Sequence, residues 1–192
     1  MARYFHKELE KIKKMILSLG AMVEERVRRV TAAIADRDAA VAEEIVRSDY
    51  EIDEMEVDIE EECLKALALY QPVAIDLRFI IAVIKINNDL ERIGDQVVNI
   101  AQRVVTIAKH PVVPYHFEYS EMADKAESML RMSLDSLVNQ DLDVAIKVLH
   151  LDDEVDTIKN DAYDRIKQAI AGGLTEDIGY MINLLHLVPD CD

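Results

Sequence analysis

The sequence predicts an all-α fold built as two tandem three-helix bundles, with long antiparallel helices. Three observations support this prediction: helix-forming residues dominate, breaks are few, and the breaks follow the same rhythm in both halves. The 192 residues include only five glycines and four prolines, and no tryptophan. Abundant Ala, Leu, Ile, Val, Glu and Asp are typical of a nearly all-helical chain, and a chain of this length can bury a sizeable core.

Helix-breaking residues divide the first half into three helices. The run "ADRD" (35–38) separates the first helix from the second, and Asp38 suits the N-cap of the second. The run "YQPV" (70–73) contains Pro72, which suits the first turn of the third helix. We therefore predict that residues 1–109 form the first three-helix repeat.

The second half repeats this order after a linker. Two prolines three residues apart in "KHPVVPYH" (109–116) block helical continuation on both sides, so residues 110–116 are predicted to be the linker. Breaks at 139–141 and 171–175 divide residues 117–192 into a second set of three helices. The last of these helices is expected to be incomplete and cut short.

A repeat in the residues supports two copies of one unit. Sliding the chain by 103 positions aligns apolar residues, such as Ile52 with Val155, without a gap. Aligned apolar positions are common between amphipathic helices, whereas embedded acids at one fixed offset are not. The aligned acids are Asp38 with Asp141, Asp49 with Asp152, and Asp53 with Asp156.

The predicted third helix carries an apolar seam. Alternating spacings of four and three residues are typical of a helix that packs at a shallow angle against antiparallel neighbours. This seam is predicted to be core rather than a cofactor pocket. Its members are Phe79, Val83, Ile86, Leu90, Ile93, Val97, Ile100, Val104 and Ile107.

The charge balance limits the classes of partner. Lysine plus arginine number 22 and aspartate plus glutamate 38, which gives a net charge of −16. Such a field repels nucleic-acid phosphates, and no apolar run reaches the roughly 18 residues of a membrane span. The isolated Cys63 and Cys191 form no thiol redox or zinc motif. Cations or basic protein surfaces remain as partners, unless the acids serve only to keep the chain soluble.

Two acid pairs in the first repeat are spaced for a shared site. Asp49 and Asp53, and likewise Glu91 and Asp95, lie four residues apart and so share a helix face. If the second and third helices form a hairpin at Pro72, the two pairs are equidistant from the turn and face each other. Their mutual repulsion favours a bound cation or protons, and carboxylates are hard oxygen ligands. The alternative is an ordinary solvated helix face.

Residues around these pairs are candidates to support the site. Asn88, Asn99 and Gln102 lie on the same stripe as the acids, and Arg92 is placed to pair with an acid or to cover the site. Gly94 costs about 1 kcal/mol relative to alanine within a helix, which predicts close approach of another helix or a ligand. No histidine follows a glutamate at the spacing of di-iron oxidases, and no phosphate loop or nucleophile elbow occurs, so no enzyme is predicted.

The runs "SDYEIDEMEVDIEE" and "QPVAIDLRFIIAVIKINNDLERIGDQVVNIAQRV" closely resemble the first repeat of the PhoU family, and the resemblance covers nearly the whole chain. It implies two three-helix bundles whose acid-x-x-x-acid motifs bind divalent ions or multinuclear metal clusters. The metal is left open between iron, manganese, zinc, magnesium and calcium. The implied ligands are Asp49, Asp53, Glu91, Asp95, Asp152, Asp156 and, in an incomplete fourth motif, Asp192.

The resemblance also implies a regulatory function. It predicts a cytoplasmic protein, reaching to the inner face of the membrane, that negatively regulates phosphate uptake and phosphate-responsive genes. The implied partners are the phosphate ABC transporter and a membrane histidine kinase. Leu184, Leu185 and Leu187 favour association, so a homodimer is expected. The alternatives are a carboxylate-bridged metal-dependent hydrolase and a purely structural helical scaffold.

Overall fold

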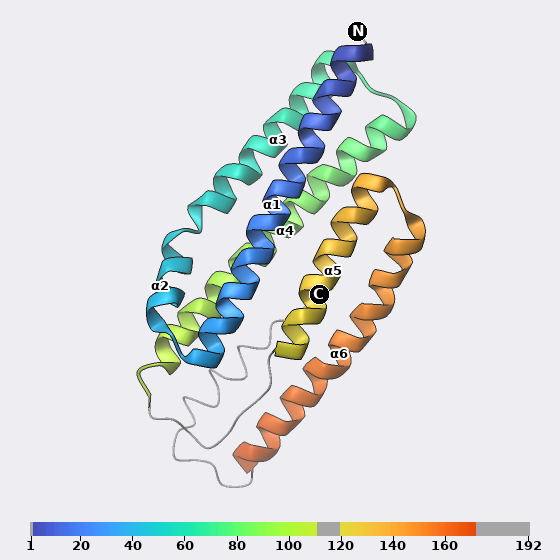
Figure 1. Ribbon diagram of the computed structural model, residues 1–192. Coiled ribbons are helices and arrows are strands. Elements are labelled where there is room, and N and C mark those ends of the chain that lie inside the picture. Colours follow the sequence, from blue (N-terminus) through green and yellow to red (C-terminus); the bar gives the residue numbers. More distant parts are fainter. Residues whose placement is uncertain (1, 111–119, 172–192) are drawn as a thin grey trace.

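The computed structural model describes residues 2–110 and 120–171, which form six helices and no strand (Figure 1). An all-α helical bundle is therefore confirmed. The helices of the first half are α1 (Ala2–Asp36), α2 (Ala39–Arg47), α3 (Tyr50–Tyr70) and α4 (Ala74–Ile107), and those of the second half are α5 (Ser120–Asn139) and α6 (Leu142–Ala171). None of them combines the length and apolarity needed to cross a bilayer.

Helix α1 is the element that joins the two halves. It packs on α2, α3 and α4 within the first bundle, and on α5, which pairs in turn with α6. Figure 1 shows α2 and α3 following one another along one side of α1, with the α5–α6 hairpin on the other side of α1. One core cluster, around Ile52, Ile59 and Leu90, lies between α1, α3 and α4 and includes Leu134 of α5. A second, around Ile45 and Val155, reaches α6.

The predicted N-cap at Asp38 is confirmed, and its geometry recurs 103 residues later. Asp38 Oδ1 accepts from the amides of Ala40 at 2.9 Å and Val41 at 3.1 Å. Asp141 Oδ1 likewise accepts from an amide of the first turn of α6, that of Val144, at 3.1 Å. The residue before each cap, Arg37 or Gln140, has a positive φ, of 53° or 56°. The residue repeat is thus also a repeat of backbone conformation.

One expected helix is instead two. Residues Ser48 and Asp49 interrupt the second helix of the first repeat, between α2 and α3. The amides of Glu51 and Ile52 bond to carbonyls only three residues back, at 3.1 and 2.9 Å. The corresponding stretch of α6 is unbroken. The two copies of the repeat therefore differ in backbone conformation at this point.

Pro72 lies outside α4, so its predicted place in the first helical turn is wrong by two residues. Gln71 ends α3 in the left-handed region, and Val73 is extended with φ −128° and ψ 163°. The extended Val73 separates the proline from the helix, which begins at Ala74. Ala74 itself has a φ of 52°, so two non-glycine residues with positive φ stand in this short connection.

The apolar seam of α4 is core, but the buried face is centred about one residue later than predicted. Phe79, Val83, Leu90, Val97, Val104 and Ile107 are buried, whereas Ile86, Ile93 and Ile100 are only half-buried. The rest of the buried face consists of the apolar Ile80 and Val98 and of three small or polar residues, Asn87, Gly94 and Ala101. A search for large apolar side chains passes over such positions, where neighbouring helices come closest.

Gly94 marks such a close approach. A Cβ atom at this position would lie 3.0 Å from Cδ1 and 3.3 Å from Cγ2 of Ile52 on α3. Of the two explanations offered for this glycine, the structure therefore supports helix packing. Apart from His110, the predicted linker and the third helix of the second repeat, with Leu184, Leu185 and Leu187, lie outside the described residues.

Candidate functional site

The two acid pairs of the first repeat come together between α3 and α4. Asp49 precedes α3 and Asp53 lies in its first turn, while Glu91 and Asp95 lie in the middle of α4. Asp53 and Asp95 lie close enough to Asp49 to raise its pKa by charge repulsion, and both act in the same way on Glu91. The hairpin geometry expected from the sequence is thus present.

A fifth carboxylate, from Glu56, joins these four, and we call the five residues the acidic cluster: Asp49, Asp53, Glu56, Glu91 and Asp95. Burial raises the pKa of Glu56 first, and the charges of Glu60 and Asp53 add to the effect. Glu56 was not predicted as a site residue. Its signal in the sequence was the continuation of acids at three- and four-residue intervals along one face of α3.

The cluster is short of positive charge. Burial is the largest cause of the raised pKa of Asp49, followed by repulsion from Asp53 and Asp95, against which Arg26 acts. For Glu91 burial again comes first, followed by the other four acids of the cluster. Each raised pKa means that the folded protein disfavours the ionised carboxylate, so a bound cation or proton is stabilised there.

Arg26 of α1 holds the helix break beside the cluster. Its side chain is only 6% exposed, with Nη1 3.5 Å from Asp49 Oδ1 and Nη2 3.2 Å from Glu51 Oε2. Nη2 also donates to the carbonyl oxygen of Ser48, so the guanidinium closes the C-terminal end of α2. The corresponding residue 103 positions later is Met129, and there α6 runs straight. The break therefore accompanies the buried arginine.

Asn87 fixes the position of Glu56. Its fully buried side chain donates from Nδ2 to the backbone oxygen of Glu56 at 2.8 Å and to Glu56 Oε1 at 3.2 Å. Within the described part of the chain, Asn87 Oδ1 accepts no hydrogen bond. Asn87, like Arg26, was missed by the sequence analysis, although both interrupt otherwise apolar faces of their helices.

The polar residues predicted to support the site lie further out. Asn88, Arg92, Asn99 and Gln102 are all exposed on α4. Arg92 Nη1 lies 3.7 Å from Asp89 Oδ1, so of its two predicted roles it takes the pairing with a neighbouring acid. The buried neighbour Asn87, rather than Asn88, contacts the cluster.

The carboxylate oxygens of the cluster suit a hard cation, but the side chains do not point toward one common point. Among residues 2–110 and 120–171, no three His, Cys, Asp or Glu side chains stand close enough to hold a metal ion. All donors in the cluster are carboxylate oxygens, which suit magnesium, calcium, manganese or iron. Asp53 and Asp95 are exposed, so rotation of their side chains can bring oxygens together without disturbing the core.

The acid pair of the second repeat has different surroundings. Asp152 and Asp156 are half-buried on α6, and Lys159 Nζ lies 3.1 Å from Asp156 Oδ1. Lys159 stands 103 residues after Glu56, so a cation replaces an acid at this point of the repeat. This pair is therefore partly neutralised by the chain itself. Asp192, the last predicted ligand, lies outside the described residues.

Neutralising Glu91 is expected to stabilise the metal-free protein at neutral pH. Because the folded-state pKa of Glu91 is raised from 4.5, the stability it contributes is present below pH 4.5 and is lost as the pH rises through the raised value. Glu91→Gln removes that loss, and we expect a gain of about 0.5 kcal/mol in unfolding free energy, the scale of like-charge repulsion on helices.

Urea unfolding in chelator, from neutral pH to about pH 4.5, measures this effect. The difference between Glu91→Gln and the unchanged protein should shrink as the pH falls. Glu61→Gln, an exposed acid on α3, is the control and should show no such trend. A Glu91→Gln protein less stable than the original at neutral pH would contradict the prediction.

Comparison with known proteins identifies the family. The PhoU domain matches residues 16–104 and 119–192, one match in each half. The chain is 35% identical over 181 residues to the phosphate-specific transport system accessory protein PhoU homolog of Aquifex aeolicus, covering 94% of this chain and 80% of that protein. The phosphate-specific transport system accessory protein PhoU homolog of Pseudomonas putida is 34% identical over 157 residues. The match covers 81% of this chain and 61% of that protein, so this chain spans less than two thirds of its length.

Solved structures agree with this assignment. The crystal structure of PhoU from Pseudomonas aeruginosa superposes with a TM-score of 0.90 at 30% identity, covering 96% of this chain and 88% of that one. The phosphate transport system regulatory protein PhoU from Streptococcus pneumoniae gives a TM-score of 0.80 at 26% identity, with coverages of 96% and 89%. With domain matches in both halves and relatives above 30% identity, the chain belongs to the PhoU family.

Proposed function

We propose that this chain is a cytoplasmic accessory regulator of phosphate transport that restrains uptake and phosphate-responsive signalling. The observation that carries the proposal is the similarity, over 94% of the chain, to a protein named as an accessory of the phosphate-specific transport system. The phosphate ABC transporter and a membrane histidine kinase are its partners in this proposal, and the active species is a homodimer. The chain acts by binding, not by catalysis.

The acidic cluster is the regulatory cation site in this proposal. Asp53, Glu56, Glu91 and Asp95 supply the ligands, and Asp49 joins them when its charge contact with Arg26 is exchanged for the cation. A divalent cation supplies the positive charge that these residues lack. Because the ligands come from both α3 and α4, the residues that bind the cation also fasten these two helices to each other.

Metal analysis tests the cation site. Protein purified without chelator or affinity tag is compared with a variant carrying Asp53→Asn, Glu91→Gln and Asp95→Asn. We expect a stoichiometric divalent metal in the first and its loss from the second, with helical content unchanged. Glu54→Gln with Asp58→Asn, an exposed pair with the same four-residue spacing on α3, is the matched control and should keep its metal. Equal metal content in all three proteins, or none after reconstitution, would reject the site.

Complementation tests the regulatory role. In a bacterium that lacks its own PhoU protein, expression of this chain is expected to lower phosphate uptake and to silence a phosphate-responsive reporter when phosphate is plentiful. Sedimentation equilibrium of the purified chain should give twice the chain mass. An unchanged reporter and unchanged uptake, with the chain present at normal abundance, would count against the proposed function.

A further inference from the structure

One end of the first bundle gathers exposed apolar side chains. The start of α1, the end of α3 and the start of α4 meet there (Figure 1). The rings of Phe5 and Tyr70 lie 5.3 Å apart, and Lys13 Nζ lies 5.6 Å from the centre of the Phe79 ring, so the three helices are in contact. We call residues 4–7 and 65–78 the bundle tip.

The apolar residues at the extremity of this tip are turned outward. The exposed fractions of the four side chains exceed 60%: Tyr4 68%, Leu69 62%, Val73 74% and Ile75 64%. Each of the three helix ends and the connection between α3 and α4 contributes at least one of them. Large apolar groups that cluster on a surface mark a site of interaction, whereas isolated ones do not.

The backbone of the tip is held in an uncommon conformation. Gln71 and Ala74, which flank Pro72 and Val73, have φ values of 47° and 52°. Non-glycine residues seldom adopt positive φ, and here two do so within four residues. The connection with these two positive φ values carries Val73, whose side chain is 74% exposed, at the extremity of the tip.

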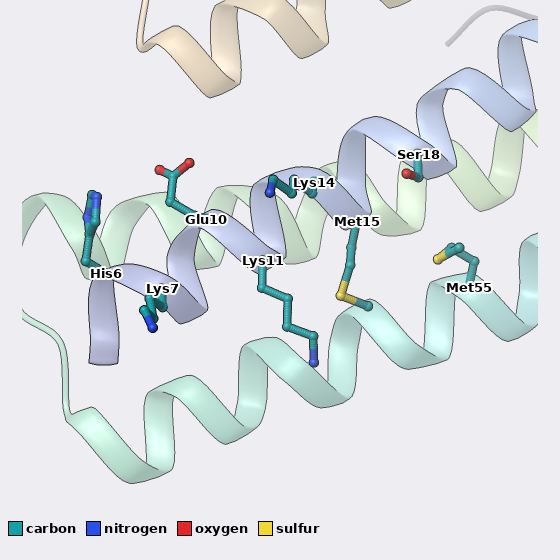
Figure 2. A pocket seen from close by; sticks show the side chains of 8 residues that line it. All are labelled: His6, Lys7, Glu10, Lys11, Lys14, Met15, Ser18 and Met55. Atoms are coloured by element: carbon teal, nitrogen blue, oxygen red, sulfur yellow. The ribbon is translucent and has the colours of Figure 1, made fainter. Parts of the chain in front are cut away.

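A basic ring lies just behind the apolar residues. Lys7, Lys65 and Arg78 are exposed, one on each of the three helices. At a helical rise of about 1.5 Å per residue, each lies roughly 4.5–6 Å from the apolar residue at its helix end. Figure 2 shows that lysines continue along α1, where Lys7, Lys11 and Lys14 line a groove of about 440 Å³.

The charge of the tip is opposite to that of the rest of the chain. The bundle tip contains three basic residues, Lys7, Lys65 and Arg78, and one acidic residue, Asp76. The remainder has 19 basic and 37 acidic residues, including Glu62, whose Oε1 lies 3.2 Å from Lys65 Nζ just behind the tip. Asp53 of the acidic cluster is 16 residues from Leu69, about 24 Å along α3. This distance exceeds the Debye length of roughly 8 Å in physiological salt, so the acids there do not cancel the tip.

We propose that the bundle tip docks the protein on a lipid bilayer that carries anionic headgroups. Tyr4, Leu69, Val73 and Ile75 enter the headgroup region, and Lys7, Lys65 and Arg78 reach the lipid phosphates one helical turn behind them. The apolar residues match the apolar side of such an interface, and the basic ring behind them matches its anionic headgroups. The exposure and charge of the tip support this docking independently of the cation site and of the role in phosphate uptake.

Vesicle binding of the full chain tests the inference. Partitioning is measured by co-sedimentation with phosphatidylcholine vesicles, with and without phosphatidylglycerol. The apolar variant carries Leu69→Ser, Val73→Ser and Ile75→Ser, and the basic variant carries Lys7→Gln, Lys65→Gln and Arg78→Gln. Leu142→Ser with Leu149→Ser on α6 is the matched control, since those leucines are equally exposed, at 72% and 67%. Circular dichroism checks that each variant is folded.

We expect binding to the anionic vesicles only, and we expect it to be lost in the apolar variant. Each basic residue near an anionic surface contributes about fivefold to binding, so the basic variant should bind about a hundredfold more weakly. The α6 control should bind like the original protein. Failure to bind phosphatidylglycerol vesicles would overturn the inference. The tip would then be assigned to a partner protein with an apolar pocket bordered by acidic residues. Binding that the tip variants retain, or that neutral vesicles match, would overturn it too.

Discussion

Arg26→Met is expected to lower the free energy of unfolding by about 2–3 kcal/mol. Removing one partner of a buried ion pair costs about 3–5 kcal/mol, and an exposed pair is worth about 0–1 kcal/mol. Arg26 lies between these limits, because its own side chain is buried while those of Asp49 and Glu51 are 26% and 49% exposed. The substitution also leaves the carbonyl of Ser48 without its guanidinium donor.

Methionine is the appropriate replacement because the chain uses it at the corresponding position, Met129. Its flexible side chain fills most of the space of the arginine stem, so the loss reports on charge and hydrogen bonding more than on packing. Urea unfolding measures the change. Arg29→Met is the control: Arg29, also on α1, has its Nη2 2.8 Å from Oε2 of Glu44 on α2 in an exposed pair, and a loss of about 0.5 kcal/mol is expected. Equal losses in the two variants would contradict the role given to Arg26.

Gly94→Leu is expected to lower the free energy of unfolding by about 3 kcal/mol. Even a Cβ atom at this position meets Ile52 at 3.0 and 3.3 Å, and the larger side chain would force α4 away from α3. Gly94→Ala should be nearly neutral, because a gain of about 1 kcal/mol in helix propensity offsets the crowding. The nearest atom, Cδ1, is the flexible end of Ile52, and it can shift by a few tenths of an ångström.

A double-mutant cycle tests the contact between these two residues. Ile52→Val removes Cδ1, the atom nearest the added Cβ, so Gly94→Ala should be more favourable in that background than alone. Gln96→Leu, an exposed position on α4, is the control for adding a leucine and should change stability by less than about 0.5 kcal/mol. Purely additive effects of Ile52→Val and Gly94→Ala would show that the approach of the helices at Gly94 is not limiting.

The contact at Gly94 also brings two acids together. Ile52 is followed by Asp53 and Gly94 by Asp95, so the close approach of α3 and α4 at this contact also sets how closely the two acid pairs approach. We expect Gly94→Leu to separate them and to bring the pKa of Glu91 back toward its ordinary value, because repulsion from Asp53 contributes to the raised pKa. NMR titration of the Glu91 carboxyl measures this change.

Much of the fold follows from local signals. The Asp38 cap, the helical seam of α4 and the facing of the acid pairs were all predictable, because each depends on residue spacing along a helix or on symmetry about a turn. The break at Ser48 was not predictable in this way, because the side chain that contacts it, Arg26, lies on another helix. Long-range contacts of this kind leave no periodic mark near the residues they affect.

Arg26 and Asn87 nevertheless left a signal at their own positions. Arg26 stands between Val23 and Val30 on the buried face of α1, and Asn87 between Val83 and Leu90 on that of α4. A polar residue within an apolar stripe must find a partner when buried, and here both partners belong to the segment that carries the acids. Searching for such interruptions, rather than for more acids, would have located both residues, although not their geometry.

The interruption between α2 and α3 also has a mechanical consequence. A continuous helix such as α6 resists bending along its whole length, because every turn is braced by the next. The hydrogen bonds that the carbonyls of Ser48 and Asp49 accept span only three residues, and the guanidinium of Arg26 contacts both Ser48 at the end of α2 and Glu51 in α3. Compliance is therefore concentrated at one point, where α3 begins and where the first carboxylate of the cluster stands. We therefore expect bending of the first bundle to be concentrated at that point, whereas α6, the corresponding helix of the second half, is continuous.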